Sequence, residues 1–225
     1  MTCFFLLDLH SKWKQMEDLI QSVIEREAQA IKTIPVNAAF SEAVELIYRQ
    51  VHQKSGKLVA SGMGKAGQIA ENIATTFSST GTPAVFLHPS DSQHGDLGVI
   101  QKNDVLLLIS NSGKTREILE LVGLAGELHP GLSLIVISGN PESVLAKSAD
   151  VFLFTGNPEE VCPLGLTPTT STTVMTVIGD ALVVGMMTKI NFTSNDYAKR
   201  HHGGYLGDKS RLQARIKGQT LNFEL

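Results

Sequence analysis

One stretch of hydroxyl-bearing residues carries the side chains that a phosphate group needs. It is Ser110–Thr115 (SNSGKT), which follows an apolar run and precedes a helical pattern. Hydroxyls, a flexible glycine and free backbone N–H groups at the start of a helix bind phosphate oxygens, and the helix dipole favours the anion. A simple helix cap would need one Ser or Thr, whereas this stretch holds three. We therefore predict a phosphate site made by Ser110, Asn111, Ser112 and Thr115.

A glycine-rich loop, Ser61–Gly67 (SGMGKAG), follows the first apolar run. Its glycines let a ligand approach the backbone, and Ser61 and Gly62 are candidate contacts. The loop lacks the ending of a Walker A motif, but its glycine count matches G-x-G-x-x-G, so a dinucleotide site is an alternative. Against it, His88 rather than an acidic residue ends the next strand. Lys65 at a helix start opposes the dipole, which indicates a nearby ligand anion or simply a solvated lysine.

Several titratable residues in the following loops are candidates for acid–base chemistry. Glu117 lies about one turn into the helix after the phosphate loop, as a capping-turn carboxylate or as a general base. His88 and His94 share a glycine-containing loop, where they either act on a ligand or lie at the surface. Glu160, taken alone, reads as an exposed loop residue. A metal would need a third ligand that the sequence does not place, so we predict that no metal or other cofactor is required.

The elements that must position these residues follow from hydrophobic periodicity. Short, continuous apolar runs alternate with helical patterns, which predicts a parallel sheet buried on both faces. Ligands of such sheets bind beyond the carboxyl ends of the strands, where these loops fall. The predicted strands are 57–61, 84–87, 104–109, 132–137 and 150–154, and the predicted helices are 16–33, 36–53, 65–79, 115–128 and 169–189.

Composition places the chain among ordinary globular proteins. It has 225 residues, 42% hydrophobic and 18% charged, with a net charge of −3 and no basic run, which argues against a nucleic acid partner. Two distant cysteines form neither a disulfide framework nor a metal knuckle, so we expect a reducing, cytoplasmic setting. The apolar start lacks the features of a signal peptide, and no stretch is read as approaching a membrane span.

The order of five motifs resembles the sugar isomerase (SIS) domain of arabinose-5-phosphate isomerases. These motifs are GMGKAG, HGDLG, SNSGKTRE, CPLGLTPTTSTT and HHGG, and the resemblance spans residues 16–207. It implies a three-layer αβα sandwich of the flavodoxin-like type, with a central five-stranded parallel sheet and an N-terminal helical pair. It also implies interconversion of D-ribulose 5-phosphate and D-arabinose 5-phosphate, which supplies 3-deoxy-D-manno-octulosonate (Kdo) for lipopolysaccharide or capsule.

The resemblance also implies roles for particular residues. The family's functional lysine falls on Lys65, its acidic residues on Glu117 and Glu160, and its C-terminal histidine on His201, which we expect to act from a neighbouring protomer. Substrate contacts fall on Gly81, Thr82, His88 and His94. Two departures stand out: most members continue into CBS domains, and His202 replaces the usual proline after the histidine. The alternatives are a regulator that binds a sugar phosphate without turnover, or another phosphosugar isomerase of this fold.

The two N-terminal amphipathic helices bury more apolar surface than one such sheet needs. We therefore expect a homo-oligomer, a tetramer being favoured, with a small sugar phosphate as ligand and with neither nucleic acid nor membrane as partner. Residues 1–15 are expected to be a disordered extension, and residues 208–225 a loose polar tail.

Overall fold

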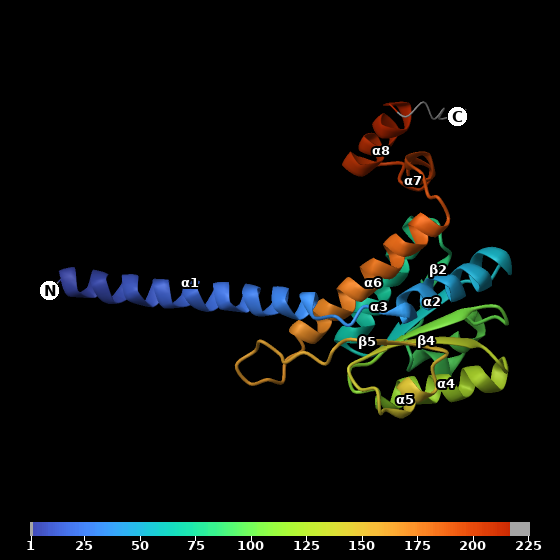
Figure 1. The fold of residues 1–225 in the computed structure, drawn as a ribbon, viewed down its shortest axis with the longest axis horizontal. Coiled ribbons are helices and arrows are strands. Elements are labelled where there is room, and N and C mark those ends of the chain that lie inside the picture. The colour runs from blue at the N-terminus through green and yellow to red at the C-terminus, as the bar shows by residue number, and fades with distance from the viewer. Residues whose placement is uncertain (1, 217–225) are drawn as a thin grey trace.

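Five parallel strands form a single sheet at the centre of the molecule (Figure 1). The computed structural model describes residues 2–216, without the side chains of residues 2–11, 214 and 215. The strand order β2-β1-β3-β4-β5 is the doubly wound order in which the chain direction switches between β1 and β3. The α/β class and the five-stranded sheet predicted from the sequence are confirmed. The strands are β1 (Leu58–Gly62), β2 (Ala84–Phe86), β3 (Val105–Ile109), β4 (Ser133–Ser138) and β5 (Val151–Phe154).

Alternate side chains of the central strands bury into two separate cores, one on each face of the sheet. On β3, Leu107 joins a core formed with α2, α3 and α6, whereas Leu106 and Leu108 join a core formed with α4 and α5. All five residues of β3 are buried, which explains why all of them are apolar. The covering helices are α2 (Ala38–Ile47), α3 (Lys65–Ser79), α4 (Arg116–Leu128), α5 (Val144–Lys147) and α6 (Thr170–Lys189).

The predicted N-terminal helical pair is present, and its first member is longer than expected. Helix α1 (Thr2–Lys32) is continuous and projects well beyond the sheet (Figure 1). The boundary predicted at residue 16 therefore does not coincide with the end of an element. Helix α2 begins at an Asn37 cap, whose side chain accepts a hydrogen bond from the N–H of Ala39, and continues as a π-helix over Tyr48–Gln53.

The C-terminal region contains two further helices, α7 (Ser194–Arg200) and α8 (Gly204–Ile216). A reciprocal capping box between Thr193 and Asp196 starts α7. The tail predicted from residue 208 is thus helical as far as Ile216, and the remainder of that prediction lies outside the described residues. Two short 3₁₀ helices, Asp91–His94 and Asp96–Val99, follow β2.

Helix α6 corrects one expectation about membrane spans. Among the described residues it is the one helix whose length and composition would allow it to cross a bilayer. Threonines interrupt the apolar residues of α6, so its sequence does not stand out as a membrane span. Here α6 packs against α1, α2 and α3, and Val174, Ile178 and Leu182 are fully buried, as in the core helix of a soluble domain.

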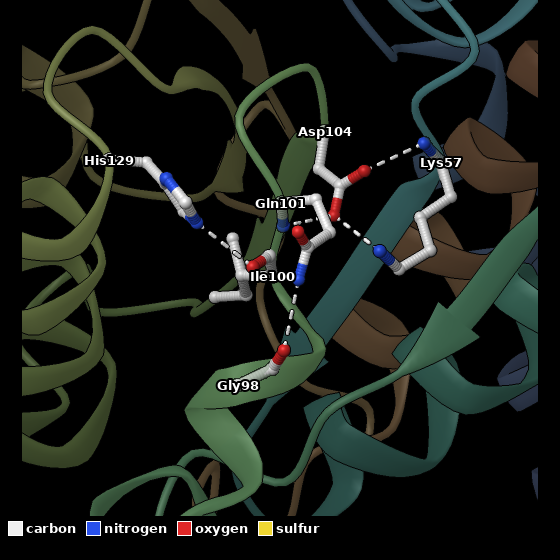
Figure 2. Close-up of polar contacts among 6 residues, drawn as sticks. All are labelled: Lys57, Gly98, Ile100, Gln101, Asp104 and His129. Atoms are coloured by element: carbon white, nitrogen blue, oxygen red, sulfur yellow. Dashed lines mark hydrogen bonds and ion pairs between the residues drawn. The ribbon is translucent and has the colours of Figure 1, made fainter.

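A buried carboxylate joins the amino-terminal ends of β1 and β3 (Figure 2). Asp104 is 1% exposed and accepts hydrogen bonds from the backbone N–H of Lys57 at 2.9 Å and of Gln101 at 2.7 Å. The ammonium group of Lys57 lies 2.6 Å from the same carboxylate. Nearby, the His129 ring contacts the carbonyl of Ile100 at 3.0 Å. These contacts hold β1 and β3 in register at the amino-terminal ends of the strands, and the hydroxyl-rich loops lie at the opposite, carboxyl ends.

Candidate active site

A large cavity lies where a doubly wound sheet is expected to bind its ligand. A cavity of about 810 Å³ opens at the carboxyl ends of β1, β3, β4 and β5, against the N-terminus of α6. This position spans the β1/β3 switch point. Its lining is rich in hydroxyl and amide groups, and includes Lys65, Ser110, Asn111, Ser112, Thr115, Asn140, Asn157, Ser171 and Thr172.

The phosphate loop predicted from the sequence forms part of this lining. The hydroxyls of Ser110 and Thr115 lie 2.8 Å apart, and the Ser112 hydroxyl accepts a hydrogen bond from the N–H of Lys114. Thr115 is the N-cap of α4 but its side chain does not cap the helix, so the first N–H groups of α4 lack partners within the helix. The loop therefore presents hydroxyls and helix-terminal amides together, which suits an anion.

Lys65 supplies a cation to the same cavity. It is the first residue of α3, it is exposed, and it lines the cavity. The preceding Gly64 has φ +59°, a conformation that suits glycine. Gly62 approaches the helix closely, because a Cβ there would lie 2.6 Å from the carbonyl oxygen of Ala66. The two glycines thus bring the start of α3, and with it Lys65, directly over the end of β1.

Glu160 has a structural task that the sequence did not reveal. Its carboxylate accepts hydrogen bonds from the N–H and hydroxyl of Thr169, at 2.7 and 2.9 Å, and from the N–H and hydroxyl of Ser171. These donors lie at the start of α6, so Glu160 caps that helix. Burial alone would raise the pKa of Glu160, but the hydrogen bonds from Ser171 and Thr169 outweigh it and hold the pKa below its usual range. The carboxylate is a poor proton acceptor in this arrangement.

Cys162 lies in the same loop, two residues beyond Glu160. Its sulfur accepts hydrogen bonds from the backbone N–H groups of Thr167 at 3.1 Å and Leu166 at 3.3 Å. The hydrogen bond from Thr167 is the main cause that lowers the pKa of the Cys162 thiol. The segment between Glu160 and α6 is therefore closed on itself around the sulfur.

The remaining residues predicted near the first and second strands have separate positions. Glu117 lies half-buried in the first turn of α4, behind the phosphate loop and outside the cavity lining. Ser61 is fully buried and donates to the carbonyl of Leu87 at 2.7 Å, so it ties β1 to the end of β2. His88 lies 3.6 Å from Asp91, and His94 is exposed at the end of a 3₁₀ helix. Both histidines follow β2, so they lie at the carboxyl ends of the strands, and β1 stands between β2 and the strands around the cavity.

Three predicted residues lie away from the cavity, near the amino-terminal end of β2. Gly81 and Thr82 precede β2, and Thr82 contacts the His52 ring at 3.0 Å. A Cβ on Gly81 would lie 2.9 Å from the Phe192 ring. The Phe192 ring contacts the Tyr197 ring edge-on. The Tyr197 ring in turn stacks on the His201 ring, with 3.8 Å between the ring centroids. Gly81, Thr82 and His201, hereafter the far-edge group, thus gather beside the C-terminal end of α6.

The far-edge group cannot reach the cavity of its own chain. The cavity lies at the N-terminal end of α6, and a 20-residue helix is about 30 Å long. Figure 1 shows α7 attached at the opposite end of α6. Within a single copy of the chain, Gly81, Thr82 and His201 therefore lie apart from the cavity.

Sequence reasoning missed the loop that follows β4. Gly139, Asn140 and Pro141 line the cavity, and the Asn140 side chain donates to the carbonyl of Ser112 at 3.1 Å. A Cβ on Gly139 would lie 2.5 Å from the Asn111 side-chain oxygen, so a larger residue there would displace the Asn111 side chain in the cavity wall. The signal was available, because this loop also follows a predicted strand at the binding edge of the sheet.

Across the described part of the chain, no group of three or more His, Cys, Asp or Glu side chains is arranged to hold a metal ion. The candidate histidines also do not converge, since His88 and His94 lie near β2 and His201 lies at the far edge.

Comparison with known proteins identifies the class to which this fold and cavity belong. Residues 52–185 match the SIS domain model, and the chain belongs to the SIS domain family. The chain is 49% identical over 190 residues to arabinose 5-phosphate isomerase KdsD of Yersinia pestis and 44% identical to that of Pseudomonas aeruginosa. These matches cover 84% of the chain and 56% of each relative, so the chain spans little more than half the length of those relatives.

Solved structures of similar length show the same architecture. A Bacteroides fragilis protein, assigned as a phosphosugar isomerase involved in capsule formation, shares 67% identity with a TM-score of 0.83, covering 84% of this chain and 99% of that protein. The c3406 protein of Escherichia coli CFT073, solved in complex with arabinose 5-phosphate, shares 37% identity with a TM-score of 0.75, covering 84% and 98% respectively.

Proposed function

We propose that this chain is an aldose–ketose isomerase that interconverts D-ribulose 5-phosphate and D-arabinose 5-phosphate. The observation that carries the proposal is the cavity at the β1/β3 switch point, in which the Ser110–Thr115 loop and Lys65 face one space. The names of the similar proteins, arabinose 5-phosphate isomerase among them, support this choice of substrate. The KdsD name and the capsule-related structural neighbour support a place in Kdo biosynthesis, for lipopolysaccharide or capsule. We place the reaction in the cytoplasm.

The reaction moves a proton between C1 and C2 of the sugar through an enediolate. It needs a phosphate anchor, a base and a group that stabilises the developing oxyanion. In our proposal, Ser110, Ser112 and Thr115 anchor the phosphate with the N-terminal amides of α4. Lys65 stabilises the enediolate oxygen. Glu117, whose role comes from the family resemblance, is the base, and the proposal requires the sugar to extend past the phosphate loop to reach it, because Glu117 lies outside the cavity lining. The proton returns from Glu117 to the neighbouring carbon, so no electrons leave the substrate.

Glu160 acts in this proposal as a positioning residue. Its carboxylate already accepts from four donors and holds the start of α6, which places Ser171 and Thr172 at the cavity wall. Asn111 contributes a further amide to the lining. Ser61 and Gly62 hold the end of β1 in place beside the cavity. Ser61 donates a hydrogen bond to the carbonyl of Leu87, and Gly62 allows the close approach of Ala66.

The far-edge group serves the site of another copy in this proposal. Gly81, Thr82 and His201 lie together, yet they are a helix length away from their own cavity. A homo-oligomer, a tetramer being favoured, would bring this group to a second cavity, whose nearby His88 and His94 would complete the substrate contacts. Mixing the inactive variants Glu117→Gln and His201→Ala should then restore part of the activity, because some sites would receive both intact residues.

The direct test supplies ribulose 5-phosphate and follows the appearance of arabinose 5-phosphate. Wild-type protein should convert it, and Glu117→Gln should lower kcat by about 10²- to 10⁴-fold, the usual contribution of a placed base. Glu127→Gln is the matched control, since it removes an exposed carboxylate from the same helix. Ligand binding without turnover would indicate a regulator instead, and turnover of a different ketose phosphate would indicate another isomerase of this fold.

A further inference from the structure

Three rings contact one another in series just beyond the C-terminal end of α6. They belong to Phe192, Tyr197 and His201, and we call them the ring column. The Phe192 and Tyr197 rings meet edge-on, with 6.4 Å between their centroids and 73° between their planes. The Tyr197 and His201 rings are nearly parallel, at 3.8 Å and 7°. This separation is shorter than the roughly 4.5–7 Å that aromatic pairs prefer, which indicates that the two rings are held by their surroundings.

A backbone carbonyl determines which nitrogen of His201 carries the proton. Nδ1 of His201 lies 3.0 Å from the carbonyl oxygen of Tyr197, one helical turn earlier in the chain. Because a carbonyl oxygen can only accept, Nδ1 is the donor and must carry a hydrogen. In the neutral ring, Nε2 then has the free lone pair. Within the described residues Nε2 has no hydrogen-bond partner, so it is the nitrogen that remains for a ligand.

The backbone of His201 is held on both sides. Its N–H donates to the same Tyr197 carbonyl at 3.1 Å. Gly207, which is buried in the first turn of α8, lies so close that a Cβ there would collide with the carbonyl oxygen of His201. The imidazole can therefore change its direction only by rotation about its own side-chain bonds. The Tyr197 ring, which lies flat against one face of the imidazole, opposes that rotation.

The other end of the ring column packs against Gly81. This residue has φ +97°, and a Cβ there would lie 2.9 Å from the Phe192 ring. Any side chain at this position would displace the ring. The guanidinium of Arg200 lies over the same ring, 5.4 Å from its centroid. Gly81 is thus linked to His201 through the rings of Phe192 and Tyr197.

We propose that Tyr197 is a positioning residue for His201. Its carbonyl holds the imidazole in the Nδ1–H form, its ring holds the imidazole plane, and together they present Nε2 to the sugar. Gly81 supports this arrangement through Phe192. Only the identity of the substrate depends here on the proposed isomerase function.

The chemistry of the reaction gives the exposed nitrogen a task. Conversion of an aldose into a ketose moves a hydrogen from C2 to C1, and it also moves the hydroxyl proton of O2 to O1. Nε2 of His201 accepts the proton from one oxygen and returns it to the other, so the imidazole ends the reaction as it began. An imidazole free to exchange its tautomers would present the lone pair for only part of the time.

Nitrogen NMR of the imidazole rings tests this geometry without substrate. Spectra of protein labelled with ¹⁵N-histidine distinguish the Nδ1–H form from the Nε2–H form, and His201→Gln identifies the His201 signals among those of the seven histidines. At a pH where the ring is neutral, His201 of the wild-type protein should be in the Nδ1–H form, although the Nε2–H form prevails for histidine in water. A wild-type ring mainly in the Nε2–H form would overturn the proposal.

Substitutions of Tyr197 separate its ring from its carbonyl. Tyr197→Ala removes the ring, so His201 should become a mixture of both forms. Its kcat should fall about 2- to 10-fold, the size expected for one lost aromatic contact, with little change in KM because the phosphate loop is untouched. Tyr197→Phe keeps the ring and should match the wild type. Tyr205→Ala is the matched control, since it removes an exposed tyrosine ring from the neighbouring helix α8.

Gly81→Ala distinguishes support of the ring column from a direct substrate contact. Its added methyl group should displace Phe192, so the His201 signals should shift and the Nε2–H form should become detectable. Gly131→Ala is the matched control, because Gly131 also has a positive φ, +83°, but a Cβ there meets nothing within 4 Å. Unchanged His201 signals in Gly81→Ala would overturn the link through Phe192.

The tautomer and the turnover can fail independently. If the protein acted on another sugar phosphate, or on none, the Nδ1–H form of His201 and its loss in Tyr197→Ala would still be observed. If Tyr197→Ala lowered only Tm, with kcat and the His201 signals unchanged, the ring would be structural and the proposal wrong, while the isomerase activity stood. Should the alanine variant unfold by circular dichroism, Tyr197→Leu, which fills the site without a flat ring, gives the same comparison.

Discussion

Replacement of Glu160 tests whether this carboxylate holds α6 or takes the proton. Glu160→Ala removes the acceptor from the N–H groups of Thr169 and Ser171 and from both hydroxyls. Loss of a helix cap costs about 0.5–2 kcal/mol, and a buried donor left without a partner costs about 1–3 kcal/mol. Because the group is only partly buried, we expect a total near the lower values, about 2 kcal/mol.

Glu160→Gln separates the charge from the hydrogen bonds. Its amide oxygen keeps the bonds that Thr169 and Ser171 donate through their N–H groups, but the charge that favours a helix N-terminus is lost. We expect a loss of about 1 kcal/mol, half that of the alanine variant. For a chain of this size, 1 kcal/mol lowers Tm by about 2–4 °C, so Tm should fall by about 2–4 °C for Gln and about 4–8 °C for Ala.

Thermal denaturation and steady-state kinetics together decide between the two roles. If Glu160 only positions α6, Glu160→Gln should lower kcat by less than about tenfold while Tm falls. Glu159→Gln, which removes an exposed neighbouring charge, should change neither. The folded pKa of Glu160 is lowered, so its stabilising charge is present above about pH 4.5 and is lost as the pH falls below it. An unchanged Tm together with a kcat loss above about 100-fold would refute our reasoning.

The phosphate loop, the Asp104 cluster and His52 each allow a further test. Ser112→Ala should raise KM about 5- to 10-fold with little change in kcat, because it removes about one phosphate hydrogen bond; an unchanged KM would place the phosphate elsewhere. Asp104→Asn should destabilise the fold by about 3 kcal/mol in urea, since it leaves the Lys57 ammonium beside an uncharged group; a loss below about 1 kcal/mol would contradict a role in fixing the strands. Burial lowers the pKa of His52, so stability should fall as the pH drops from about 7 to 5, and His52→Gln should flatten that slope in thermal scans.

The sheet and its covering helices could be predicted because strands buried on both faces leave an unmistakable pattern. Leu106, Leu107 and Leu108 alternate between two cores, so no polar residue interrupts β3. The phosphate loop could be predicted for a related reason: the end of a strand fixes the edge of the sheet at which its loop lies.

Distances between predicted residues could not be obtained in the same way. His201 and Lys65 are both functional candidates, but α6 separates them by its whole length. The role of Glu160 depends on a turn that brings Thr169 and Ser171 back to it from nine and eleven residues away. Such contacts are set by loop conformation, for which hydrophobic periodicity holds no information. Gly139 was missed for a simpler reason, since neither it nor the adjacent Asn140 and Pro141 carries a titratable side chain.

The amide-bound sulfur of Cys162 gives the molecule a natural chemical reporter. A thiol whose pKa is lowered by the Thr167 N–H is more thiolate at neutral pH, and the thiolate is the form that alkylating reagents attack. The same closed segment joins Glu160 to the first turn of α6 at the cavity wall. The rate at which iodoacetamide labels Cys162 therefore follows the opening of that segment, and it can be read by mass spectrometry while a sugar phosphate is titrated in.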